Sequence, residues 1–345
     1  MNKRVYGVIG VGAYNSNWNA DFDKGPKRLP DSRITASDKA LKYAMRDYWD
    51  QNGEKVLMKR SYTIKTVEGP KKSTSKEVAA SRTLEERYDY ITNSCIKDET
   101  DDGVILSNIM SCADVRQFGV AFAVTAHNYS ITGPVQITQG LNTYDYTLPY
   151  IQTILSPFKN SNSKSSEEGN EENTASEETE NNEKKKEDKS QTATTLGTMT
   201  LVDEAHYAYG FSINPRQARP YDHIRGDMED VMKYTEEDYA QFIEAARVAA
   251  TALDTCSKTG AENEYLIVIE GHENGKLYLA NLAEYVHVDK LDGVKRVLDL
   301  TKLIGYLELQ AKNISKIDIY TNSMRIDVNI PETTLNITIK NIFED

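Results

Sequence analysis

The residues best suited to chemistry by type and spacing lie between positions 15 and 23. Asn15, Asn17, Asn19, Asp21 and Asp23 alternate with other residues directly after an apolar run. Carboxylate and amide oxygens are ligands of hard divalent cations, so Asp21 and Asp23 with Asn19 could hold a metal ion. An EF-hand loop also needs a glycine at its sixth position, and none of these residues starts a register that supplies it. The alternative is a set of turn-forming side chains that hydrogen-bond their own backbone.

Motifs for catalysis or cofactor binding are otherwise missing from the sequence. The five histidines show no metalloprotease spacing, and the three cysteines are too far apart for a metal knuckle or a disulfide framework. Gly10 and Gly12 resemble a dinucleotide fingerprint, but Asn15 replaces its third glycine and loop-like residues follow where the motif needs a helix. The sequence therefore predicts a protein that is not an enzyme and holds no cofactor or metal.

Basic residues are concentrated in one part of an otherwise acidic chain. The net charge is -12, yet residues 24–82 contain 15 basic and 7 acidic residues, a local charge of +8. A helix predicted after Ser37 carries Lys39, Lys42 and Arg46 on the flank away from its apolar residues. Because phosphate binding depends on local potential, such a stripe could follow successive phosphates of a nucleic acid. The alternative is a solvated lysine-rich face.

Periodicity and capping residues predict a mixture of strands and helices. The expected strands span residues 5–11, 55–67, 129–139, 264–270, 317–320 and 335–339, and the expected helices span 37–49, 83–96, 103–113, 235–257 and 296–309. A polar loop is expected over 13–37. This order predicts an α+β protein with a modified ferredoxin-like, or RNA-recognition-motif, core and large insertions. The open sheet face of such a core commonly binds single-stranded RNA. The alternative is an α+β domain that binds a ligand or forms oligomers.

Residues 160–192 interrupt this pattern with a tract of Ser, Glu, Asn and Lys whose net charge is -5. Such a composition buries too little apolar surface to offset its ordering entropy, so disorder is expected. Strand-like segments flank the tract at 150–155 and 196–202, which predicts a hairpin with the tract at its tip. No apolar run is long enough for a membrane helix, and the N-terminus lacks a signal-peptide pattern, so we expect a cytoplasmic protein.

Several segments, taken in order, resemble the CRISPR-associated backbone subunit of type I-B Cascade, in the RAMP superfamily of RNA-binding proteins. The resemblance is carried by residues 17–23, 35–46, 114–119, 131–136, 155–158, 195–197 and 211–215. It covers about residues 1–270 outside the acidic tract. The segments Asp-x-Arg-x-Phe-Gly and Ile-x-Gly-Pro-Val-Gln, in series, are its most specific part.

The resemblance implies a subunit shaped like a right hand. Residues 1–345 would form one elaborated RNA-recognition-motif-like domain, with helical fingers at about 24–128, a β-hairpin thumb at 150–212, and the rest of the palm with a C-terminal elaboration at 213–345. The implied partners are the CRISPR guide RNA, further copies of the chain, other Cascade subunits and, through the guide, target DNA. Base pairing then supplies sequence specificity, while the protein holds the RNA backbone.

The resemblance and the basic stripe together predict a set of RNA-binding residues. The set is Asn15, Asn17, Asn19, Lys39, Lys42, Arg46, Arg116 and Gln136. Lys42 and Arg46 match basic residues of the family's first helix, Arg116 stands at the Asp-x-Arg position, and Gln136 ends the Gly-Pro-Val-Gln segment. The three asparagines occupy the loop after the first strand. Relatives in type III complexes place an RNA-cleaving aspartate in this loop. The resemblance therefore implies one enzymatic alternative, a metal-dependent endoribonuclease acting through Asp21 or Asp23.

Overall fold

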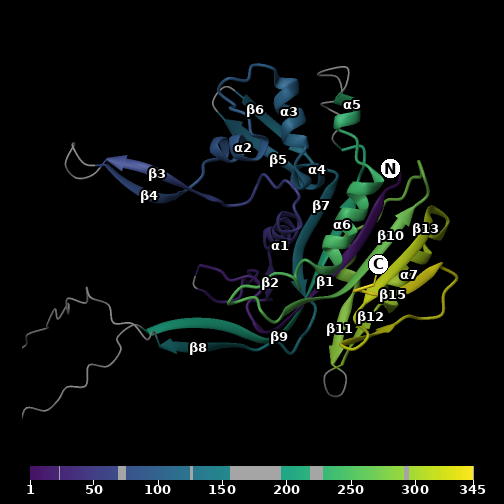
Figure 1. Ribbon diagram of the computed structural model, residues 1–345. Helices are drawn as coiled ribbons and strands as arrows, with labels where there is room; N and C mark the ends of the chain where they lie inside the picture. Colours follow the sequence, from purple (N-terminus) through teal and green to yellow (C-terminus); the bar gives the residue numbers. More distant parts are fainter. Residues whose placement is uncertain are drawn as a thin grey trace, which may run out of the picture.

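The computed structural model describes residues 1–22, 24–68, 75–124, 127–155, 196–217, 228–290 and 295–344. The expected disordered tract 160–192 lies outside these ranges. The central sheet contains β1 (Val5–Ser16), β2 (Thr35–Ala36), β7 (Val135–Asn142), β8 (Pro149–Leu155), β9 (Leu196–Ile213), β10 (Ala261–Gly271), β13 (Ile314–Thr321) and β15 (Ile337–Asn341). Their order is β15-β13-β10-β1-β9-β7-β2, and β8 pairs with β9. The neighbours β10, β1, β9 and β7 are all antiparallel, whereas β15 runs parallel to β13 (Figure 1).

Two helices, α1 (Asp38–Gln51) and α6 (Glu236–Val248), cover one face of this sheet. Leu41, Met45 and Phe242 pack there with Ile9 and Val11 of β1 in one buried core. The caps expected from the sequence are confirmed, since Ser37 accepts a hydrogen bond from Ala40 N and Thr235 forms a capping box with Asp238.

The opposite face of the sheet is covered by a C-terminal layer. The layer contains the 3-10 helix η2 (Leu282–Tyr285), β11 (His287–Lys290), β12 (Arg296–Asp299), α7 (Thr301–Glu308), the 3-10 helix η3 (Ala311–Asn313) and β14 (Ile326–Asn329). Tyr6 and Val8 of β1 face this layer and pack with Leu298, Leu303 and Ile304. Alternate residues of β1 therefore serve two cores, as strand geometry requires.

A smaller unit with its own core lies at one end of the sheet (Figure 1). It consists of α2 (Leu84–Thr92), α3 (Asp102–Met110), α4 (Ala113–Phe118), β5 (Gly119–Val124), β6 (His127–Thr132) and the short α5 (Met228–Val231). Tyr88, Ile105 and Phe122 are central to its core, to which Met228 and Met232 also contribute. The expected insertion at 24–128 is thus broader than this unit, because α1 packs in the core of the main sheet.

Two hairpins project from the same side of the body, on the left in Figure 1. One pairs β3 (Tyr62–Glu68) with β4 (Ser75–Ser81). The other pairs β8 with the first half of β9, from Pro149 opposite Val202 to Leu155 opposite Leu196. The sequence-based expectation of two pairing strands around the acidic tract is confirmed at this level. Within the described ranges, no helix is long and apolar enough to cross a membrane.

Two of the elements predicted from the sequence are contradicted by the structure. The strand expected over 129–139 is two strands in different sheets, β6 and β7, which are separated at Gly133. Gly133 packs so closely against the backbone of Gly119 that a Cβ would meet Gly119 N at 2.3 Å. The first residues of the helix expected over 296–309 form the strand β12 instead, which pairs with β11 and β14. Asp299 then accepts hydrogen bonds from the N–H and the hydroxyl of Thr301, and α7 starts there.

Other boundaries differ from expectation for identifiable reasons. β1 continues to Ser16, beyond the expected loop start, because it pairs with β9 as far as Val202. The expected strand at 55–67 begins only at Tyr62, since the carboxylate of Asp114 on α4 accepts hydrogen bonds from Leu57 N and Met58 N. α6 ends at Val248 rather than near 257. At this end of the helix, Asn263 accepts hydrogen bonds from Ala250 N and Thr251 N and donates one to Ala246 O.

Candidate nucleic-acid interface

The loop between β1 and α1 is fastened at its base by Asn17. This side chain is 3 % exposed and donates hydrogen bonds to Thr200 O at 3.0 Å and Lys24 O at 3.3 Å. Its backbone N–H donates to Ser257 O at 2.7 Å. Asn17 therefore lies inside the protein and ties the loop to β9, which sets the position of the exposed residues around it.

The other two asparagines of the predicted set also hold the loop in place. Asn19 Oδ1 accepts a hydrogen bond of 2.6 Å from the backbone N–H of Ser37, the N-cap of α1. Asn15 is exposed in a left-handed backbone conformation (φ 47°), and its Oδ1 accepts a hydrogen bond of 3.1 Å from the Tyr150 hydroxyl on β8. The loop thus joins the first helix on one side to the β8–β9 hairpin on the other.

The basic stripe of α1 divides into exposed and engaged side chains. Lys39 is exposed, with no carboxylate partner in the part of the chain that the structure describes. Lys42 forms an ion pair with Asp38 at 3.0 Å, and Arg46 forms one with the buried Asp114 at 3.0 Å. Both cations also lie over the ring of Phe118, at 5.2 and 5.4 Å from its centroid. Lys39 is therefore the most accessible cation of the stripe.

Residues of the Asp-x-Arg-x-Phe-Gly segment join the smaller unit to the main sheet. Asp114 accepts hydrogen bonds from Leu57 N and Met58 N at 2.8 and 2.9 Å, besides pairing with Arg46. Arg116 binds the carboxylate of Asp238 on α6 at 2.6 Å. Contacts inside the protein thus use the guanidinium of Arg116, and its assignment to RNA stays a prediction.

The Gly-Pro-Val-Gln segment packs against the end of the same motif. Gly119 has φ +77°, and a Cβ there would meet Ile131 O at 2.1 Å, so a side chain would strain both backbone and contact. Gln136 is exposed and donates a hydrogen bond of 2.9 Å to Gly133 O. Gln136 therefore remains accessible.

Three further cations, which sequence reasoning did not single out, belong to the loop. Lys24 and Arg28 are exposed and Lys27 is half-buried, and none has a carboxylate partner among the described residues. They are positioned by isolated β-bridges between Ala20 and Pro26 and between Arg28 and Ile34. Their only signal in the sequence was the excess of basic residues over 24–82.

Of the two aspartates in the endoribonuclease alternative, the structure describes Asp21 alone. Asp21 is exposed, and its Oδ1 accepts a hydrogen bond of 2.9 Å from Phe22 N. Asp23 lies outside the described residues. Within the described part of the chain, no group of three His, Cys, Asp or Glu side chains could hold a metal ion.

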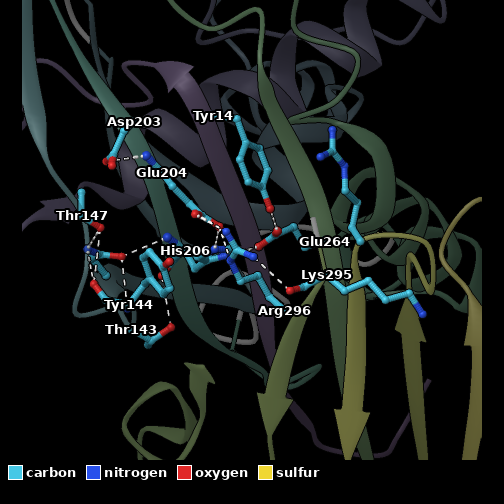
Figure 2. A network of polar contacts seen from close by, with 12 residues as sticks. Tyr14, Thr143, Tyr144, Thr147, Asp203, Glu204, His206, Glu264, Lys295 and Arg296 are labelled. Atoms are coloured by element: carbon cyan, nitrogen blue, oxygen red, sulfur yellow. Dashed lines mark hydrogen bonds and ion pairs between the residues drawn. The ribbon is translucent and has the colours of Figure 1, made fainter. Parts of the chain in front are cut away.

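A buried network of charged side chains lies at the base of the β8–β9 hairpin (Figure 2). His206 of β9 is fully buried, with Nδ1 2.6 Å from Glu264 Oε2 and Nε2 2.9 Å from Glu204 Oε1. Tyr14 donates its hydroxyl hydrogen to Glu264. Arg296 of β12 donates from Nε and Nη2 to the two oxygens of Glu204, each at 2.6 Å. The network therefore connects the C-terminal layer to the central strands β1, β9 and β10.

The network carries compensating charges. Burial lowers the pKa of His206, but the charge of Glu264 and the hydrogen bonds that His206 donates to both glutamates outweigh this effect and raise the pKa to about 9. Burial would raise the pKa of Glu204, yet hydrogen bonds from His206 and Arg296 lower it to about 2. At neutral pH the imidazolium is thus held between two carboxylates. Because His206 has no access to solvent, we interpret the network as one that holds strands β1, β9, β10 and β12 together and not as one that contacts a substrate.

Comparisons with known proteins place this geometry in a family. A solved chain described as "CRISPR RNA-guided surveillance complex, pre-nicking" has a TM-score of 0.52 and 12 % identity, covering 98 % of this chain and 97 % of that one, which shows the fold. A second, "CRISPR RNA-guided surveillance complex", has a TM-score of 0.44 and 13 % identity over 91 % and 88 % of the two chains. No curated protein matches the sequence. The family model of CRISPR-associated protein Cas7 matches residues 3–304, and the chain therefore belongs to the Cas7 family.

Proposed function

We propose that this chain is a non-catalytic subunit that binds the guide RNA and polymerises along it as the backbone of a cytoplasmic, type I-B-like Cascade complex. Membership of the Cas7 family over residues 3–304 carries the proposal. The solved chain with a TM-score of 0.52 is described as part of a CRISPR RNA-guided surveillance complex, which supports guide RNA and other complex subunits as partners. Target DNA would be recognised through pairing with the guide and not by this chain.

The arrangement of the main sheet supports the interpretation of a ferredoxin-like palm. The antiparallel order β10-β1-β9-β7, with α1 and α6 on one face, supports the proposal of a split βαβ core like that of the RAMP superfamily. In this proposal the unit around α2–α4 corresponds to the fingers and the β8–β9 hairpin to the thumb. Both the β3–β4 and β8–β9 hairpins project from one side, where α1 and the loop after β1 also lie in the view of Figure 1.

The exposed cations of the loop and α1 are the proposed phosphate contacts. Lys24, Arg28 and Lys39 are exposed without carboxylate partners in the described ranges, so their charge is available to an anion. The hydrogen bond between Asn19 and Ser37 keeps the loop beside the start of α1. We assign Asn17 and Arg116 to holding this surface, because their polar groups are used inside the protein.

Salt-dependent binding to single-stranded RNA of guide length tests the proposal. The double variant Lys24→Ala/Lys39→Ala should bind more weakly, and its slope of log K against log salt should fall by about 1.4, since each phosphate contact on a single strand contributes about 0.7. The matched control is Lys302→Ala/Lys312→Ala, which removes two exposed lysines from α7 and η3 in the C-terminal layer. Wild-type protein should also form multimers whose size grows with RNA length. Equal losses in both double variants would contradict the assignment of this surface.

Failure to bind RNA at low salt, both alone and with the other subunits of the complex, would contradict the function itself. The alternative function is an endoribonuclease acting through Asp21 or Asp23, and our proposal is that the chain leaves RNA intact.

A further inference from the structure

Phe22, at the tip of the loop after β1, has no contact that removes it from water. Its relative exposure is 104 %, the highest among the exposed large apolar side chains of the described residues. Leaving a phenylalanine ring in water is unfavourable, but single exposed apolar residues are common on protein surfaces, so exposure alone does not indicate a function. The backbone around Phe22 and the chemistry of its neighbours distinguish this position from an ordinary surface residue.

The loop tip is a closed turn rather than a frayed end. Asp21 N donates to Gly25 O at 2.8 Å, and Lys24 N donates to Asp21 O at 3.0 Å. The carboxylate of Asp21 also accepts the N–H of Phe22 at 2.9 Å. The described residues on either side of the tip, Asp21 and Lys24, are therefore held by hydrogen bonds, and a loop positioned in this way lowers the entropic cost of using the Phe22 side chain for binding.

A depression of about 340 Å³ lies next to this tip, between the loop and the β8–β9 hairpin. It is lined by Asp21, Gly25, Pro26, Arg28, Ile151 and Thr200. Ile151 is itself 70 % exposed, so one wall is apolar, whereas Arg28 supplies a cation. A volume of this size lies at the lower end of the range of small-molecule pockets and suits one planar ring.

We propose that Phe22 stacks on an unpaired base of the bound single strand, while Lys24 and Arg28 contact the phosphates on either side of it. The inference rests on the proposed function and names the residue that would grip a base. Sites for single strands combine an aromatic platform with a cationic backbone track, and a base has an apolar face that covers Phe22 as no free phosphate does. Lys24 and Arg28, which have no carboxylate partners in the described ranges, favour a polyanion over an apolar protein surface.

Replacing the ring should weaken RNA binding through the base alone. Phe22→Ala should lower affinity for single-stranded RNA on the order of 5- to 150-fold, with Phe22→Leu intermediate and Phe22→Trp close to wild type. The control Phe343→Ala, another exposed phenylalanine at 52 %, should have no effect. On an oligonucleotide with the same backbone but abasic positions, wild type and Phe22→Ala should bind equally, because the variant has lost only a stacking surface.

Fluorescence of the Phe22→Trp variant reports the contact directly. The native tryptophans, Trp18 and Trp49, are 0 % and 1 % exposed, so acrylamide should quench only the introduced indole. Adding RNA should quench this indole and shield it from acrylamide, and abasic oligonucleotide should do neither.

The outcomes separate this inference from the proposed function. If wild type binds RNA but Phe22→Ala binds equally well and the introduced indole is not quenched, the stacking inference is overturned and the function stands. If the indole becomes shielded by raising protein concentration without RNA, Phe22 packs on another copy and the inference is also overturned. If neither the chain nor its reconstituted complex binds RNA, the function fails and this inference fails with it.

Discussion

The imidazolium buried between Glu204 and Glu264 predicts that the protein loses stability as the pH rises from 6 to 8. The pKa of His206 is about 9 in the folded protein, against its usual value of 6.5. The folded state therefore keeps a proton that the unfolded state releases. The stabilising contribution is complete below pH 6.5 and is lost as the pH rises toward 9.

The magnitude follows from the difference between the two pKa values. At about 1.4 kcal/mol for each factor of ten, the full contribution is about 3 kcal/mol, of which about 2 kcal/mol is lost between pH 6 and pH 8. Lys258 sets the upper limit of the useful window, because burial lowers its pKa to about 8. Above that pH Lys258 sheds its proton in the folded state first, so its contribution to stability grows with pH and opposes that of His206.

Urea denaturation between pH 5.5 and pH 8 measures the effect. Wild type should lose about 2 kcal/mol of unfolding free energy more than His206→Gln over pH 6 to 8, because the variant lacks the titrating group. His206→Gln should also be less stable at pH 6, since Glu264 loses its cationic neighbour in a buried site. The exposed His272 provides the matched control, and His272→Gln should keep the wild-type dependence. A His206→Gln variant with the wild-type slope would refute the charged network.

Four further outcomes test other parts of the structure. Arg116→Met should cost about 3 kcal/mol in urea denaturation, because it leaves the 5 % exposed carboxylate of Asp238 without its cation; a loss below 1 kcal/mol would contradict the junction. Gly119→Ala should reduce the melting temperature and soluble yield sharply, since a Cβ would meet Ile131 O at 2.1 Å, and a wild-type melting curve would contradict that. Asp21→Ala and wild type should both leave labelled RNA intact with Mg²⁺, whereas cleavage by wild type alone would support the endoribonuclease alternative. Deleting 161–192 should leave RNA affinity unchanged at physiological salt and raise it at low salt, because the tract is acidic, and abolished binding would contradict this.

Local signals in the sequence predicted local structure well. Ser37 and Thr235 identified the starts of α1 and α6, because a capping side chain bonds to a backbone group within three residues. The apolar run of β1 likewise predicted a buried strand. Such elements depend on near neighbours in the chain, and periodicity and capping report on those neighbours.

Elements that depend on distant partners were predicted poorly. Residues 296–299 were predicted as the start of a helix but form β12, because β11 and β14 supply strand partners on both sides. The break between β6 and β7 depends on the contact of Gly133 with Gly119, which no periodicity reveals. The ion pair between Arg116 and Asp238 joins residues 122 positions apart, so the sequence indicated an important arginine without showing what it binds.

The same limit explains which candidate site residues the sequence could reveal. The segment Asp-x-Arg-x-Phe-Gly forms a packed junction, in which Asp114 and Arg116 bind partners inside the protein. Such a junction supports a surface without being accessible on it. Lys24 and Phe22 stand out only once their exposure is known, since a loop tip tolerates many residue types. Substitutions at Arg116 should therefore lower stability and RNA binding together, whereas substitutions at Lys24, Lys39 or Phe22 should lower binding while the unfolding free energy stays the same. If Lys24→Ala/Lys39→Ala lost stability in parallel with affinity, these residues would belong to the fold as the motif residues do, and the RNA would have to follow another surface.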